Sequence, residues 1–117
     1  MIIRDEDVLW RRLHPGWVND GVLSSIAFVD RRSGKVSVHW SGGIALADVR
    51  RHLKPTQLDE VAEIAAGEPR SLECRVEHVP TPDDPSHSQF YPLAPSTSGA
   101  RRIAKMLALK ARLVSLP

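Results

Sequence analysis

The sequence of 117 residues predicts one α+β domain over residues 1–117, with an antiparallel sheet, short helices and an amphipathic C-terminal helix. Two observations predict this class. Lys35–Trp40 alternates polar and apolar side chains, which is typical of a strand, and residues 97–116 repeat apolar side chains at helical spacing. Prolines and glycines divide the rest into short elements.

The first element admits two interpretations. The acidic residues Asp5, Glu6 and Asp7 suit the first turn of a short helix. Residues 8–13 are equally compatible with a strand, and Pro15 ends either element. The stretch GWVNDG that follows is rich in turn-forming residues.

Residues 22–40 predict a β-hairpin, with the turn RRSG at residues 31–34 between its strands. The second strand carries Val36, Val38 and Trp40 at alternate positions, so we expect these three side chains to be buried on one face. Ser37 and His39 then lie on the opposite, polar face.

The middle of the chain consists of short elements. Residues 45–53 have the composition of a short helix that stops before Pro55. Residues 58–66 are compatible with either a helix or a strand. The remaining elements are a helical turn at residues 69–74, a strand at 75–80, a short strand at 88–91 and the helix at 97–116.

Composition limits the kind of protein. The only cysteine, Cys74, allows no internal disulfide and no metal site built from several thiolates. No window approaches 18 apolar residues, and the N-terminus lacks the pattern of a secretory signal. We therefore expect a cytoplasmic protein that does not enter a membrane.

The loop VPTPDDPSHSQFYP, residues 79–92, has two interpretations. Its prolines favour extended and turn conformations, and Asp83 and Asp84 order such a loop by accepting backbone hydrogen bonds. Alternatively, His87 acts as a base or ligand, with Arg12 as its partner in a small enzyme. A metal needs three or four converging ligands, and no nucleotide or nucleophile motif occurs, so we predict neither a metal nor a cofactor.

Arginine outnumbers lysine twelve to four and occurs in four Arg-Arg pairs. The pair Arg101-Arg102 lies in the first turn of the predicted C-terminal helix, after Ser96 or Ser98 as the N-cap. Backbone N–H groups and guanidinium groups would converge on an anion there. Further basic side chains would continue this anion site along the helix, at Lys105 and Arg112.

The C-terminal helix has two apolar stripes at helical spacing. Ile103, Leu107 and Val114 form the first, extended by alanines at positions 100, 104 and 111. The second consists of Met106, Leu109 and Leu113. A surface helix of a monomer needs one stripe, so the second predicts deep burial, a homodimer or a partner contact.

Several segments together resemble a family of small, uncharacterised bacterial proteins. The resemblance covers residues 8–90 through VLWRRLHPGWV, SSIAF, GKVSV, VAEIAAG-x-x-R and V-x-x-x-P-x-P-x-D-P-S-H-S. It implies a bacterial, cytoplasmic protein with a companion role beside other genes, and a role for His87 beyond loop structure. Asp84 takes the place of an asparagine in the family motif. A fainter similarity, through LWRR, LSSIAF and VEH, is to mono-ADP-ribosyltransferases.

Two classes of function follow. The first is a binding or accessory module for an anionic partner, either an acidic protein surface, a nucleotide or a nucleic acid. The aromatic content of 5% does not favour stacking platforms for single-stranded nucleic acid. The second is a small transferase or hydrolase, similar to ADP-ribosyltransferases, that uses His87 with arginine side chains.

Overall fold

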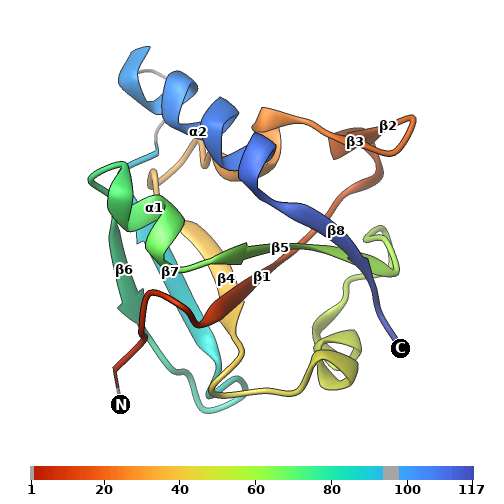
Figure 1. Ribbon diagram of the computed structural model, residues 1–117. Helices are drawn as coiled ribbons and strands as arrows, with labels where there is room; N and C mark the ends of the chain where they lie inside the picture. Colours follow the sequence, from red (N-terminus) through yellow and green to blue (C-terminus); the bar gives the residue numbers. More distant parts are fainter. Residues whose placement is uncertain (1, 94–97) are drawn as a thin grey trace.

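The computed structural model describes residues 2–93 and 98–117, apart from the side chain of Ser98. It confirms the α+β class: six strands form an antiparallel sheet in the order β6-β7-β4-β1-β5-β8, and β2 pairs with β3 in a separate small sheet (Figure 1). The large sheet contains β1 (Val8–Arg12), β4 (Val36–Trp40), β5 (Glu60–Ala65), β6 (Arg75–His78), β7 (His87–Tyr91) and β8 (Arg112–Ser115). The small sheet contains β2 (Val18–Asn19) and β3 (Val22–Leu23).

The helical elements are short except for one. They are α1 (Gly67–Ser71), α2 (Ser98–Lys110) and three 3₁₀ turns, η1 (Pro15–Trp17), η2 (Ser25–Phe28) and η3 (Leu46–His52). No helix among the described residues is long and apolar enough to cross a membrane. The two segments that the sequence left open, residues 8–13 and 58–66, both contain strands, β1 and β5.

The large sheet is covered on both faces. On one face, Leu9, Val36 and Phe90 belong to the main core, to which α2 contributes Ala104 and Leu107. On the other face a smaller core holds Trp10 and Val61 from the sheet, Val49 from η3 and Leu116 near the C-terminus. Figure 1 shows α2 at one side of the sheet and the yellow-green turn of η3 at the opposite side.

The burial of β4 confirms part of the prediction and corrects another part. Val36, Val38 and Trp40 are buried, as the alternation indicates. His39 is only 3% exposed, although it lies on the face that the sequence predicts to be polar. The smaller core explains the difference, because the second face of the sheet is also covered at this point.

The predicted hairpin over residues 22–40 is wrong in its pairing. The hairpin of this region joins Val18–Asn19 to Val22–Leu23, and Asp20 and Gly21 form its turn with φ values of 52° and 77°. The chain then enters η2, where the hydroxyl of Ser24 accepts a hydrogen bond from the amide of Ile26. Strand β4 consequently pairs with β1 and β7 and not with the residues just before it.

The C-terminal helix is shorter than predicted. It ends at Lys110, and β8 follows after Ala111, whereas the periodic pattern extends the helix to residue 116. Strand β8 pairs with β5 along its whole length, from Arg112 opposite Glu63 to Ser115 opposite Glu60. Pairing with a distant strand therefore overrides the local helical pattern, as tertiary contacts often do.

Candidate functional site

The loop between β6 and β7 directs one of its two aspartates inward. Thr81 and Asp84 exchange backbone hydrogen bonds of 3.0 and 3.1 Å, which close a tight turn. Asp83 stays exposed at the tip of this turn, whereas Asp84 is 7% exposed. The loop is thus an ordered turn that carries a carboxylate into the interior of the protein.

The carboxylate of Asp84 lies in a cluster of polar side chains. Its Oδ1 accepts hydrogen bonds from the backbone amide of Ser86 at 3.0 Å and from the Ser86 hydroxyl at 2.5 Å. Its Oδ2 lies 3.0 Å from Nδ1 of His39. Burial alone would raise the pKa of Asp84, but the hydrogen bonds from Ser86 and the charge of His39 in its protonated form prevail and lower it from 3.8.

His39 is neutral at pH 7. Burial lowers its pKa from 6.5 to about 4, although the negative charge of Asp84 acts in the opposite direction. The neutral ring donates from Nδ1 toward Asp84. The Ser86 hydroxyl lies 3.0 Å from the same ring nitrogen, whereas a serine nucleophile and its aspartate lie at opposite nitrogens of the histidine between them. These three residues therefore do not form a catalytic triad.

His52 connects this cluster to a cavity. Its ring lies 5.0 Å from the ring of His39 between centroids, and its Nε2 lies 3.9 Å from Oδ1 of Asp84. Arg12 fixes the backbone here by donating from Nη1 to the carbonyl of His52. The cavity has a volume of about 510 Å³, and its lining is Gly43, Ile44, Arg51, His52, Asp83 and Pro85.

His87, the predicted catalytic candidate, lies beside this cluster and not at its centre. It is the cross-strand neighbour of His39 on β7, and its Nδ1 lies 2.9 Å from the carbonyl of Val79. The lining of the cavity includes Arg51 and His52 and does not include His87. The other candidate, Arg12, does lie next to the cluster, as a neighbour of His52.

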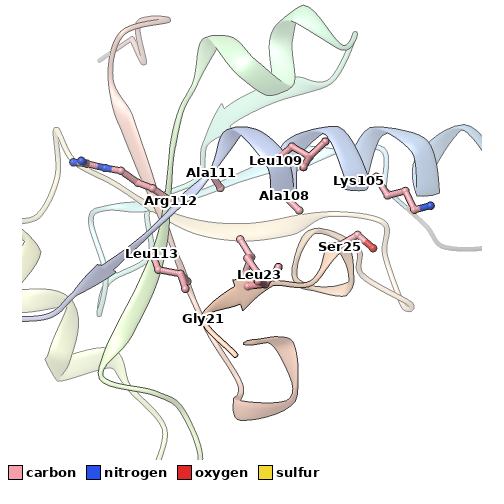
Figure 2. A pocket seen from close by; sticks show the side chains of 10 residues that line it. Gly21, Leu23, Ser25, Lys105, Ala108, Leu109, Ala111, Arg112 and Leu113 are labelled. Atoms are coloured by element: carbon pink, nitrogen blue, oxygen red, sulfur yellow. The ribbon is translucent and has the colours of Figure 1, made fainter. Parts of the chain in front are cut away.

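A second hollow lies along α2, on the other side of the molecule. It has a volume of about 640 Å³ and lies between the C-terminal half of α2, the start of β8 and the strand β3. Figure 2 shows Leu23, Ala108 and Leu113 gathered around it, and the exposed Leu109 of α2 also lines it. A smaller hollow of about 250 Å³ shares Ser25 and Lys105 with it. We call the two together the α2 groove.

The predicted anion-binding residues do not form one ridge. Arg101, Arg102 and Lys105 are exposed on α2. Arg112 belongs to β8, where it lines the larger hollow and its Nε donates to Glu63 at 2.6 Å, and its side chain extends away from Leu113 (Figure 2). Ser98 begins α2, but its side chain and the whole of Ser96 lie outside the described residues.

Exposed apolar side chains gather around the α2 groove. Leu109 is 85% exposed and Val22 67% exposed, and both line it, as does Ile26. Met106, three residues before Leu109 on α2, is a fourth exposed apolar residue. The second apolar stripe is therefore exposed within the helix, whereas Leu107 of the first stripe is fully buried.

Comparison of the chain with protein-family models, curated proteins and solved structures finds no match. The resemblance to a bacterial family and the similarity to ADP-ribosyltransferases therefore stay predictions. Among the described residues, no three histidine, cysteine, aspartate or glutamate side chains are arranged to hold a metal ion.

Proposed function

We propose that the protein is a binding module whose α2 groove accepts an acidic, amphipathic segment of a partner protein. The observation that carries the proposal is an apolar groove with cations at its edge. The groove is lined by Val22, Leu23 and Leu109, while Lys105 supplies positive charge.

The apolar side of the proposal rests on exposure. Most exposed apolar residues of a monomer are scattered singly, and a contiguous group marks an interaction site. Among the described residues, the large apolar side chains that are exposed are Ile2, Val22, Ile26, Val79, Met106 and Leu109. Three of these line the α2 groove, so a partner would remove them from water.

The charge of the groove supports an acidic partner. Of the residues that the structure describes, its lining includes Arg101, Lys105 and Arg112 and no aspartate or glutamate. Arg112 is already paired with Glu63, so Lys105 is the cation of the lining that bears on a ligand. Charge complementarity of this kind selects among partners and speeds their association.

An acidic protein segment suits the groove better than a nucleic acid does. The apolar part of the lining is aliphatic, and the described residues contribute to it none of the aromatic side chains on which unpaired bases stack. A duplex presents phosphates and few apolar groups, so it would leave Val22 and Leu109 uncovered.

Binding of synthetic peptides tests the proposal. The probes are short peptides with one apolar and one glutamate-bearing face, prepared in strand-forming and in helix-forming sequences, each with a counterpart that has lysine for glutamate. We expect saturable amide shifts in α2 and β3 with the acidic peptides only. Leu109→Glu should weaken this binding about tenfold or more.

Ile2→Glu is a matched control, because Ile2 is 84% exposed and Leu109 is 85% exposed. Equal effects of the two substitutions would show that the groove has no special role. Binding of a DNA duplex, with no binding of either acidic peptide, would replace the protein partner by a nucleic acid.

A second candidate function is hydrolysis by an acid–base mechanism at the cavity beside His52. The observation in its favour is a half-buried imidazole with the buried carboxylate of Asp84 behind it. His52 would take a proton from a water molecule whose oxygen attacks an ester, and would return the proton to the leaving alcohol. Arg51 in the lining suits a substrate with an anionic group.

Hydrolysis of 4-nitrophenyl acetate and 4-nitrophenyl phosphate tests this second candidate. His52→Gln should abolish the release of nitrophenol. His14→Gln is the control, because His14 packs on Trp17 and not in the Asp84 cluster. Absence of turnover by the unaltered protein, or equal turnover by the two variants, would rule against the candidate.

A further inference from the structure

Two walls of the α2 groove are free edges of two sheets. Within residues 2–93 and 98–117, strand β8 is at the end of the six-stranded sheet, and β3 has only β2 as a neighbour. The larger hollow of the groove is lined by Val22 and Leu23 from β3 and by Arg112 and Leu113 from β8. A slot thus lies between two strand edges, with α2 beside it.

The hydrogen-bond register identifies the backbone groups that face this slot from β8. Leu116 donates its amide to the carbonyl of Asp59 at 2.9 Å, directly opposite in the register of β8 and β5. In an antiparallel pair such positions alternate, so Arg112 and Val114 also bond to β5. Leu113 and Ser115 therefore direct their N–H and C=O groups away from β5, toward the open edge.

The same reasoning applies to β3. Ser24 donates to the carbonyl of Trp17 at 2.7 Å, directly opposite in the register of β2 and β3. Leu23 therefore directs its backbone groups away from β2. Backbone groups beside an apolar groove are costly to leave without partners once water is displaced. A helical ligand bonds its own backbone internally and cannot supply these partners.

We propose that the partner segment binds in extended form, as an added strand between β8 and β3. This inference rests on the proposed function, since it specifies how the acidic segment is held. Backbone hydrogen bonds to Leu113 and Ser115 would give affinity, and alternate side chains would contact Leu109 and Leu23. A glutamate at the end of the segment that lies near Lys105 would supply the charge complementarity.

The edge of β8 is open to such an addition. Native proteins often block edge strands with inward charges or prolines. The charged side chain of β8 is Arg112, which extends away from Leu113 in Figure 2 and pairs with Glu63 on the neighbouring strand. A second copy of β8 is a poor occupant, because it would bring another arginine and no carboxylate.

Amide hydrogen exchange with the strand-forming acidic peptide tests the inference. We expect the peptide to slow exchange at Leu113 and Ser115 at least tenfold, while Arg112 and Val114 change little because β5 already protects them. A version of the peptide with N-methyl groups at alternate residues should lose its binding. The helix-forming acidic peptide should bind more weakly than the strand-forming one.

Ser115→Pro supplies the matched test on the protein. Proline is tolerated in an edge strand where its missing N–H faces outward, so β8 should still form. We expect the variant to bind the strand-forming peptide about tenfold more weakly, whereas Ser115→Ala should bind as the unaltered protein does.

The possible failures differ between the two proposals. Tighter binding of the helix-forming peptide, with no protection of Leu113 and Ser115, would overturn strand addition and leave the binding module standing. Slow exchange at both amides in the free protein would also overturn strand addition. Absence of binding by both acidic peptides would overturn both proposals.

Discussion

Nδ1 of His39 on β4 lies 3.0 Å from the carboxylate of Asp84, and both residues are buried. This contact joins the middle of the sheet to the loop between β6 and β7. Ser86 completes it from the same loop, with its amide and hydroxyl on the other carboxylate oxygen. The loop is therefore held by its second aspartate.

Replacement of the two aspartates should have unequal effects on stability. Asp84→Ala removes the buried carboxylate that both His39 and Ser86 contact, so we expect it to lower the free energy of unfolding by about 3 kcal/mol. Asp83→Ala, at the exposed neighbouring position, should change it by less than about 0.5 kcal/mol. Urea denaturation of both variants measures the difference, and equal midpoints would contradict the assigned role of Asp84.

Stability should decrease with falling pH because of His39. Burial lowers its pKa to about 4 from the value of 6.5 expected for the unfolded chain. Between pH 6.5 and 4, the His39 ring of the unfolded chain binds a proton that the folded protein does not bind. The free energy of unfolding therefore decreases as the pH falls through this range. We expect a loss of up to about 3 kcal/mol as the pH falls from above 6.5 to 4.

Urea denaturation at several pH values measures this loss, and an NMR titration of the His39 ring gives its pKa directly. The slope of stability against pH in this range should be smaller in His39→Gln than in the unaltered protein. A His39 ring that titrates near 6.5 would contradict the prediction.

The two apolar stripes of α2 should respond differently to truncation. Leu107 is fully buried, so Leu107→Ala should lower the free energy of unfolding by about 2–5 kcal/mol. Leu109 is 85% exposed, so Leu109→Ala should have little effect on the unfolding of a monomer. Thermal denaturation of the two variants separates the structural stripe from the exposed one.

The exposed stripe also predicts self-association if no partner is present. We expect light scattering to give a dimer mass at high protein concentration and a monomer mass for Leu109→Glu. A monomer mass for the unaltered protein at all concentrations would contradict self-association through the exposed stripe.

Arg11 should be important for stability and not for binding. Its Nε and Nη1 donate to the carbonyls of Ala27 at 3.0 Å and Ser37 at 2.9 Å, and the guanidinium lies over the ring of Trp17. We expect Arg11→Lys to lower the free energy of unfolding by about 1–3 kcal/mol, because an ammonium group cannot reproduce this planar fork. Arg31→Lys, at an exposed position, is the control.

The pair Arg101-Arg102 tests the predicted anion site at the start of α2. If a nucleic acid binds there, its affinity should fall steeply with salt, and the double substitution Arg101→Ala/Arg102→Ala should make that dependence shallower. Fluorescence anisotropy with a labelled oligonucleotide over a salt series measures both slopes. No binding at low salt would dispose of the anion site.

Local pattern was sufficient for some elements and not for others. The alternation of Val36, Val38 and Trp40 predicted β4 and its buried face, because a strand places successive side chains on opposite faces. The burial of His39 was not predictable, since it depends on η3 and on a loop far along the chain. The sequence carried the signal of the observed hairpin in Asp20-Gly21, a favoured two-residue turn.

The candidate site shows the same division. Asp84 stood out in the sequence, and its role in ordering the loop was predictable from its position before proline. Its partners were not, because His39 and His52 come from separate elements whose proximity only the folded sheet creates. The strand after Lys110 was missed for a similar reason: no glycine or proline ends the helix there, and β5 alone determines the change.

The contribution of α2 to the main core constrains when the protein can fold. Leu9, near the start of the chain, packs in the same core as Leu107, and β5 lacks one neighbour until β8 has been made. During synthesis, the face of the earlier strands that packs on α2 therefore remains uncovered until α2 and β8 have left the ribosomal tunnel. We expect a chain that stops before Ser98 to expose this core and to depend on chaperones. A domain whose core is complete within its first hundred residues would not expose its core in this way.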